Sequence, residues 1–257
     1  MDTIPSPVQQ KTIPTLYNMS SSQAHNCLWA LEELSASHSI KYKVKNLPRR
    51  DPATAKTLGA LFPVNKSPIV TLAPFSSSPE SQTAASTIYQ VVPGVLTESR
   101  LILQFFSDYY SAGQWVPASE EDKRRDVFFT EFGHVSLALK INYCIALEVI
   151  ASFMPFGIRH LLLLLFSPII KYFMKDQEMM YGVMEGALTD EKPWFSGERM
   201  GLADFNMSFP IDVAVQRGYF DGGRFPRCKE WHGRVVGREA YQRALKAGGE
   251  YDLKKFA

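Results

Sequence analysis

Three consecutive serines at residues 20–22 precede the segment "AHNCLWALEEL", whose apolar residues recur at the spacing of an amphipathic helix. Free backbone N–H groups and the positive end of the helix dipole gather at such a start, so the position favours negative charge. A serine hydroxyl there either caps the helix or points at a ligand. The serines alone leave both interpretations open.

A second polar cluster is the tripeptide Lys66, Ser67 and Pro68, which joins a loop to a predicted strand. If the Ser67–Pro68 bond is cis, the backbone N–H and C=O of Ser67 face outward, where an extended peptide can pair with them like an added strand. The alternative is a trans proline that simply begins an edge strand.

The dipeptide Glu98–Ser99 ends a predicted strand and opens the helical segment "RLILQFFSDYY". Ser99 can offer its hydroxyl and a backbone N–H to a carboxylate, and Glu98 can pair with an ammonium. The alternative is a capping serine beside a solvated glutamate.

Other catalytic arrangements are poorly represented. The three cysteines, Cys27, Cys144 and Cys228, lie far apart without a CxxC pair, so neither a zinc site nor a disulfide framework is indicated. The five histidines show no metal-ligand spacing, and neither GxSxG nor HExxH is present, so we expect no metal and no hydrolase chemistry. Cys27 is predicted to be a buried core thiol.

The composition sets the class of protein. With 257 residues, 46% of them apolar, the chain is long enough for two modest domains. A formal net charge of +2 gives no reason to expect a nucleic-acid partner. The first residues contain no apolar run of signal-peptide length, and the cysteine usage suits a reducing compartment, so we expect a cytoplasmic protein.

The pattern of elements changes near the middle of the chain. Helical patterns follow the first and the last of four predicted strands, which gives a β-α-β start, a hairpin and a closing helix. A Ser/Pro-rich insertion at residues 74–86 is predicted to be an exposed loop. Residues 111–119 carry the Gly, Pro and Ser of a linker, and the rest is almost wholly helical. The predicted strands are residues 12–19, 40–47, 67–73 and 87–92, and the later helices are residues 120–152, 169–188 and 204–217.

Residues 153–174, "FMPFGIRHLLLLLFSPIIKYFM", are the most apolar segment. A membrane-spanning helix needs about 20 apolar residues, whereas Pro155, Pro168 and three basic side chains interrupt this one, so integral insertion is not expected. The simplest interpretation is a helix buried between neighbours or lining an apolar pocket. Peripheral contact with a membrane remains the alternative.

Several short motifs occur in one order along nearly the whole chain. They are "SQAHNCLWALEEL", "FPVNKSPIV", "LTES", "GLADFNMSFPI" and "FPRCKEWHGRVVGREAY". In this order the chain resembles the cytosolic glutathione transferase family, and its first helix is most similar to that of the fungal and bacterial serine-type members.

The resemblance implies a fold and a domain division. The expected fold is an α/β thioredoxin-like N-terminal domain at residues 1–110, which binds glutathione. A linker at residues 111–119 leads to an all-α domain at residues 120–257, which carries the second-substrate pocket. The family also implies a homodimer.

The resemblance further implies roles for particular residues. Ser22 corresponds to the catalytic serine that donates a hydrogen bond to the glutathione sulfur and lowers its pKa. Glutathione is the co-substrate, held by Lys66, Ser67, Pro68, Glu98 and Ser99. The candidates for the second-substrate pocket lie on one side of a helix and are Phe128, Phe132, Ser136 and Tyr143.

Two departures from the family pattern bear on activity. Gln23 and Asn26 stand where serine-type relatives often carry arginines, so two positive charges near the thiolate are missing. Gly201 replaces the usual Ser or Thr that caps a helix of the second domain, but Asp204 can still support that helix start. We expect a transferase that adds the glutathione thiolate to an apolar electrophile. The alternatives are a glutathione-dependent double-bond isomerase of a specialised substrate and a non-catalytic glutathione-binding module.

Overall fold

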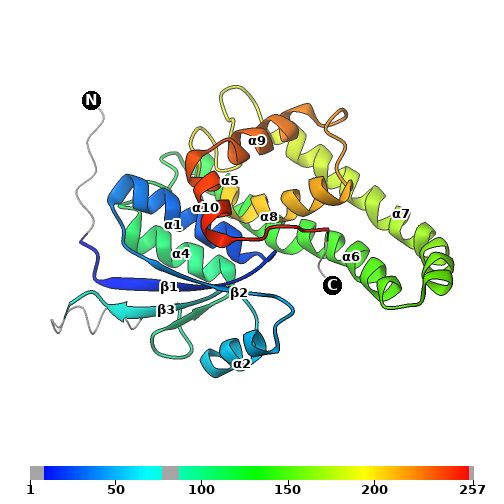
Figure 1. The fold of residues 1–257 in the computed structure, drawn as a ribbon. Coiled ribbons are helices and arrows are strands. Elements are labelled where there is room, and N and C mark those ends of the chain that lie inside the picture. Colours follow the sequence, from blue (N-terminus) through cyan, green and yellow to red (C-terminus); the bar gives the residue numbers. More distant parts are fainter. Residues whose placement is uncertain (1–8, 77–86, 255–257) are drawn as a thin grey trace. The chain divides into compact units, whose positions relative to one another are not determined.

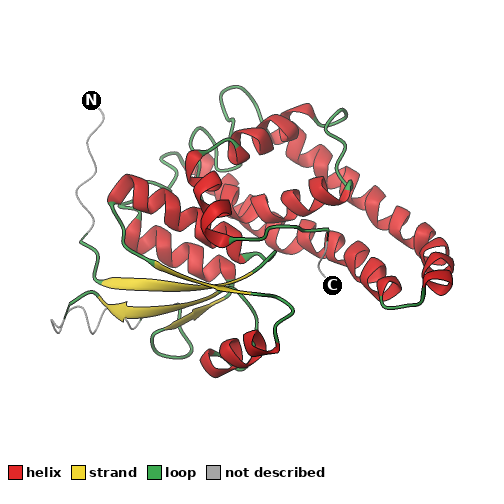
Figure 2. Cartoon of the chain, in the orientation of Figure 1, coloured by secondary structure: helices red, strands yellow, loops and turns green. Residues whose placement is uncertain are grey.

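The computed structural model describes residues 9–76 and 87–254 of the chain. The chain divides into two compact units (Figures 1 and 2). Unit 1 consists of residues 1–116 and 235–251, and unit 2 of residues 117–234 and 252–257. The first is a small mixed sheet with helices and the second is helical, so the predicted fold class is confirmed.

Unit 1 is built on a four-stranded sheet with the order β2-β1-β3-β4. The central strand β1 (Thr12–Met19) runs parallel to β2 (Lys43–Leu47) and antiparallel to β3 (Ile69–Pro74). The short β4 (Val95–Thr97) pairs antiparallel with β3. The ends of β1, β3 and β4 therefore meet where the predicted glutathione-binding residues begin.

Helices cover both faces of this sheet. Helices α1 (Ala24–His38) and α4 (Ser99–Tyr110) lie on one face, and α2 (Pro52–Leu61) lies on the other (Figure 1). The face under α1 and α4 is mostly apolar, with side chains such as Leu28 and Phe106 completely buried. Burial of this apolar area holds the starts of α1 and α4 in place.

The last part of the chain joins unit 1 through ion pairs to α1. Helix α10 (Glu239–Gly248) packs on α1. Arg238 binds Glu33 through both carboxylate oxygens, at 2.5 and 2.9 Å, and Arg243 Nε lies 2.9 Å from Glu32 Oε2. Residues 235–251, which the sequence analysis assigned to the helical domain, group with unit 1 for this reason.

Two elements of unit 1 differ from the sequence prediction. Residues 87–91 form turns and bends, Val92 makes an isolated bridge with Val95, and the fourth strand is the three-residue β4, which pairs with β3 from Ile69 to Thr71. Helix α2 was not predicted, although Asp51 caps it and Pro52 occupies its first turn. Most of the predicted insertion loop, at residues 77–86, lies outside the described residues.

Unit 2 contains one long continuous helix, whose middle turn is π-helical, and several further helices. Helix α5 continues into a six-residue π-helical segment, η1, and then into α6 without a break. Helix α8 is buried over most of its length and contacts α5 and η1. The bounds are α5 (Glu120–Glu131), η1 (Phe132–Leu137), α6 (Ala138–Ser152), α7 (Phe156–Ala187), α8 (Leu202–Arg217) and α9 (Pro226–Val236), which ends just beyond the unit.

Helix α7 differs from two predictions made from the sequence. Pro168 lies inside the helix and does not end it. A proline removes one bond to the carbonyl four residues earlier, here that of Leu164, and both residues lie on the exposed side of α7, where that carbonyl does not need a protein partner. The amino-terminal half of α7 is also exposed rather than buried between neighbours. Residues 120–152 and 156–187 are each long and apolar enough to cross a membrane, by length and composition only.

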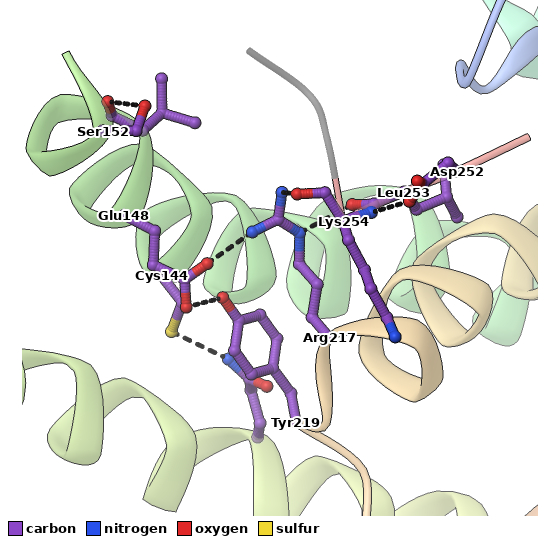
Figure 3. Close-up of polar contacts among 10 residues, drawn as sticks. Cys144, Glu148, Ser152, Arg217, Tyr219, Asp252, Leu253 and Lys254 are labelled. Carbon is purple, nitrogen blue, oxygen red and sulfur yellow. Dashed lines mark hydrogen bonds and ion pairs between the residues drawn. The ribbon is translucent and has the colours of Figure 1, made fainter.

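A polar network inside unit 2 connects α6, α8 and the C-terminal segment (Figure 3). Arg217 donates to Glu148 Oε2 at 2.5 Å and to the carbonyl oxygens of Leu253 and Lys254 at 2.8 and 3.1 Å. The hydroxyl of Tyr219 donates to the other oxygen of Glu148 at 2.5 Å. Burial and the Glu148 carboxylate together raise the pKa of Tyr219, so its hydroxyl remains a donor.

We expect Arg217→Leu to lower the free energy of unfolding by about 1 to 3 kcal/mol, because it leaves the half-buried Glu148 carboxylate short of a charged partner. Tyr219→Phe removes a single bond to the same carboxylate and should cost about 1 kcal/mol. Urea unfolding curves of the two variants check the order. Equal stability of Arg217→Leu and the parent would contradict this role of the network.

Candidate active site

A cavity of about 80 Å³ lies in unit 1 where α1, β3 and α4 begin. Its lining comes from the first residue before α1, the loop after α2, and the junction of β4 and α4. All five residues predicted to bind glutathione line this cavity. The lining residues are Gln23, Phe62, Val64, Lys66, Ser67, Pro68, Thr97, Glu98 and Ser99.

The Ser67–Pro68 peptide is cis, which is the first of the two alternatives that the sequence left open. Ser67 Oγ donates to the Tyr17 carbonyl oxygen at 3.0 Å and accepts from the Met19 N–H at 3.1 Å. The side chain is thus tied to the end of β1. Ser67 lines the cavity and precedes Ile69, the first residue of β3, so it lies outside the β3–β4 ladder.

Glu98 sits in a backbone conformation that L residues rarely adopt, with φ 64° and ψ 111°. Such a conformation costs about 1 to 3 kcal/mol and persists only where the surrounding structure or a function maintains it. Here it turns the chain sharply from β4 into α4. The turn places Glu98 and the first N–H groups of α4 at the cavity.

Ser99 carries the most informative atom of the site. The residue is 3% exposed, and its hydroxyl oxygen is buried without a hydrogen-bond partner. A buried polar group left without a partner costs about 1 to 3 kcal/mol. An acceptor placed in the cavity at the start of α4 would satisfy it, and a carboxylate would also gain from the helix dipole.

The charged groups of the cavity have both signs. Lys66 and Glu98 are exposed and lie on its lining, with the N-terminus of α4 beside Glu98. A ligand that carries two carboxylates and one ammonium would find an opposite charge for each: Lys66, the α4 N-terminus and Glu98.

Ser22 lies at the start of α1 but does not line the cavity. It is 5% exposed; its hydroxyl donates to the Met19 carbonyl at 2.6 Å and accepts from the Ala24 N–H at 3.2 Å. For Ser22 to donate to a sulfur atom, its proton must first leave Met19. The neighbouring Gln23 does line the cavity.

The other two serines of the run do not cap α1. Ser20 Oγ accepts from the backbone N–H of Arg49 at 3.1 Å, and Ser21 N donates to the Glu250 carbonyl at 3.0 Å. The Arg49 guanidinium donates to the carbonyls of Ser20 and Ser21 at 3.2 and 2.7 Å. Arg49 therefore brings a positive charge to the start of α1, where the sequence showed only Gln23 and Asn26.

Cys27 is confirmed as a core thiol. Its side chain is completely buried, and burial raises its pKa far above that of a free thiol. All three cysteines are free and buried. No group of histidine, cysteine or acidic side chains among the described residues could hold a metal ion.

The predicted second-substrate residues all lie in unit 2. Phe128 on α5 is half exposed and stacks on Phe132 of η1, with ring centroids 5.6 Å apart. Ser136 also lies in η1, and Tyr143 on α6 contacts Phe173 at 5.0 Å. The wider turn of η1 lies between Phe128 and Tyr143, so their spacing in sequence does not by itself place them on one face.

Four further residues line the cavity without having been predicted to do so: Gln23, Phe62, Val64 and Thr97. Three of them were within reach of the motifs, because Phe62 and Val64 belong to "FPVNKSP" and Thr97 to "LTES". Gln23 was noted only as a missing arginine. The contribution of Arg49 carries no signal in the sequence, because it depends on the path of the loop between β2 and α2.

Comparison with known proteins agrees with this architecture. Residues 168–239 match the family model of the glutathione S-transferase C-terminal domain. Glutathione S-transferase 1 of Saccharomyces cerevisiae is 22% identical over 225 residues, which cover 86% of this chain and 88% of the yeast protein.

Solved structures of such proteins share the fold. A glutathione S-transferase from Actinobacillus pleuropneumoniae superposes with a TM-score of 0.65 at 21% identity, covering 95% of this chain and 97% of that one. A glutathione transferase homologue from Lodderomyces elongisporus, solved with two glutathione molecules per subunit, gives a TM-score of 0.65 at 18% identity, covering 92% and 99%.

The fold and the cavity define a two-unit protein with a thioredoxin-like sheet unit and a helical unit, which is the glutathione S-transferase architecture. With the matched C-terminal domain and the yeast relative, the chain is similar to the glutathione S-transferase family in sequence as well as in fold.

Proposed function

We propose that this protein binds glutathione in the cavity of unit 1 and adds its thiolate to an apolar electrophile. The observation that carries the proposal is the buried, unpartnered hydroxyl of Ser99 at the start of α4, in a cavity that also contains Lys66, Ser67 and Glu98. Glutathione is an extended peptide with two carboxylates and one ammonium, which is the set of charges that these residues complement.

Each part of glutathione has a partner in this proposal. The γ-glutamyl carboxylate accepts from Ser99 and from the first N–H groups of α4, and the ammonium on the same carbon pairs with Glu98. The backbone of the cysteinyl residue pairs with Ser67, beside Pro68, as an added strand would. Lys66 binds the glycyl carboxylate.

The chemical step requires the thiolate. A free thiol has a pKa near 8.5, so it is mostly protonated at neutral pH. In this proposal the start of α1 and a hydrogen bond from Ser22 lower that pKa, and the thiol proton passes to solvent. The sulfur then forms a C–S bond with the electrophile, whose leaving group departs with the bonding electrons or whose carbanion takes a proton from water.

The second substrate binds against the helical unit in this proposal. Phe128, Phe132 and Tyr143 supply apolar surface and Ser136 a single hydroxyl. We further propose a homodimer in the cytoplasm, as the family resemblance implies, which sedimentation of the purified protein tests.

We expect glutathione to raise the melting temperature of the protein, because a ligand that binds only the folded state stabilises it by mass action. Ser99→Ala should weaken binding about tenfold or more, since a hydrogen bond to a charged group contributes about 1.5 to 3 kcal/mol. The free variant should melt no lower than the parent, because this hydroxyl has no partner to lose. Glu98→Ala should abolish the shift. Calorimetric titration measures the affinities.

Ser107→Ala is the matched control, because Ser107 is a second buried serine on α4 outside the cavity. It should bind glutathione like the parent. Parent protein that gains no stability from glutathione, or Ser99→Ala that binds as tightly as the parent, would remove this cavity from consideration as a glutathione site.

Measuring how much glutathione is consumed distinguishes conjugation from isomerisation. Conjugation consumes one glutathione for each electrophile, whereas isomerisation of a conjugated alkene returns it after thiolate addition, bond rotation and elimination. Mass spectrometry of both substrates separates the two reactions. If the protein binds glutathione but converts no electrophile or alkene, it is a non-catalytic glutathione-binding module.

A further inference from the structure

The hairpin of α6 and α7 in unit 2 exposes an unusual amount of apolar surface. Phe153, Phe156 and Leu164 are 72%, 82% and 72% exposed. The two helices pack along each other, and their connecting turn lies at the end of the hairpin away from α8 (Figure 1). A monomeric protein rarely leaves a contiguous apolar surface of this kind open, so the surface indicates an interaction.

The exposed residues form a stripe along α7. Ile158, Leu161, Leu165, Ile169 and Tyr172 follow each other at intervals of three or four residues, so they share one face of the helix, and all are at least 46% exposed. We call these five residues the α7 stripe. A helix that presents leucine, isoleucine and an aromatic ring on one face has the composition of helices that lie in a membrane interface.

The charged residues of the sequence between Glu148 and Asp176 have a single sign. No aspartate or glutamate occurs between Glu148 and Asp176, whereas that interval contains Arg159, Lys171 and Lys175 as well as a histidine. The two flanking acids are already paired, Glu148 with Arg217 and Asp176 with Lys140. The part of α7 from Arg159 to Lys175 is therefore rich in apolar residues and carries only positive charge.

This charge distribution indicates which kind of partner binds the α7 stripe. In a two-fold contact with a second copy, the same patch would face itself and bring the basic residues of both copies together without an acidic residue in the interval to neutralise them. An anionic lipid surface offers apolar depth for the α7 stripe and negative charge for Arg159, Lys171 and Lys175. We propose that the α6–α7 hairpin docks the protein peripherally on anionic membranes.

The test is flotation of the purified full-length protein with two kinds of vesicle, phosphatidylcholine alone and an equal mixture of phosphatidylcholine and phosphatidylserine. We expect flotation with the mixed vesicles and much less with phosphatidylcholine alone. Lys171→Gln with Lys175→Gln should lower partitioning to the mixed vesicles about 30-fold, because each basic residue near an anionic surface contributes about 1 kcal/mol, a factor of about five.

The apolar contribution is tested with Leu161→Glu and Leu165→Glu together. Both side chains are exposed, so the fold should be retained, which the melting temperature verifies. Flotation should fall about 100-fold or more, because each buried leucine contributes a factor of at least about ten. Ile88→Glu is the matched control, since Ile88 is an 89% exposed residue of unit 1, and it should float like the parent.

Three results would overturn the proposal: a parent protein that stays in solution with the mixed vesicles, a leucine double variant that floats as well as the parent, or a vesicle-free dimer that only this double variant loses. The last result would assign the hairpin to contact with a second copy.

Discussion

Ser22→Ala is expected to raise the pKa of the thiol of bound glutathione by about one to two, which leaves about 10- to 100-fold less thiolate at neutral pH. A hydrogen bond to a charged group contributes about 1.5 to 3 kcal/mol, and each change of one in a pKa corresponds to 1.36 kcal/mol. Affinity for glutathione should change little. The ultraviolet absorbance of the thiolate, titrated against pH in the complex, measures the effect, and turnover should recover partly in alkali.

The structure supplies a sharp comparison for this experiment. Ser22 Oγ donates to the Met19 carbonyl, whereas Gln23 lines the cavity. Ser21→Ala is the control, because Ser21 Oγ donates to the Glu250 carbonyl at 3.4 Å and Ser21 lies outside the cavity lining. If Ser22→Ala titrates like the parent and Gln23→Ala raises the thiol pKa, the donor is Gln23 and the role proposed for Ser22 is wrong.

Asp204→Ala is expected to lower the free energy of unfolding by about 3 to 6 kcal/mol, a large part of the 5 to 15 kcal/mol typical of a folded protein. The carboxylate is completely buried and accepts from the backbone N–H groups of Phe195 and Gly201 at 2.9 and 3.0 Å and from Trp231 Nε1 at 2.8 Å. Removal of Asp204 leaves these donors buried without an acceptor. Burial raises the pKa of Asp204, and these donors oppose that rise.

Urea unfolding measures this loss. Asp190→Ala is the control because Asp190 is exposed, and it should stay within about 0.5 kcal/mol of the parent. A loss below 1 kcal/mol in Asp204→Ala with an unchanged denaturant slope would show that α8 does not depend on this carboxylate.

The helix start at Asp204 illustrates what short-range sequence signals can predict. The sequence placed Asp204 three residues after the capping position, and the carboxylate does bind the Gly201 N–H. Strand β1 was predicted with its observed bounds, residues 12–19. In contrast, the β-branched residues at 87–92 suggested a strand that does not form, because a strand at the edge of a sheet needs a partner and residues 95–97 already pair with the edge of β3.

The sequence by itself determined the fold class, the order of the two kinds of fold and five of the nine residues that line the cavity, because these depend on local motifs that keep their spacing. Only the tertiary structure decided how the serine run is bonded, because Arg49 and Glu250 reach it from distant parts of the chain. The same holds for residues 235–251, which join unit 1 through ion pairs between residues about two hundred positions apart in sequence. The exposure of the α7 stripe could likewise not be predicted from the sequence. An apolar helical face has the same residue pattern whether another helix covers it or it is left exposed.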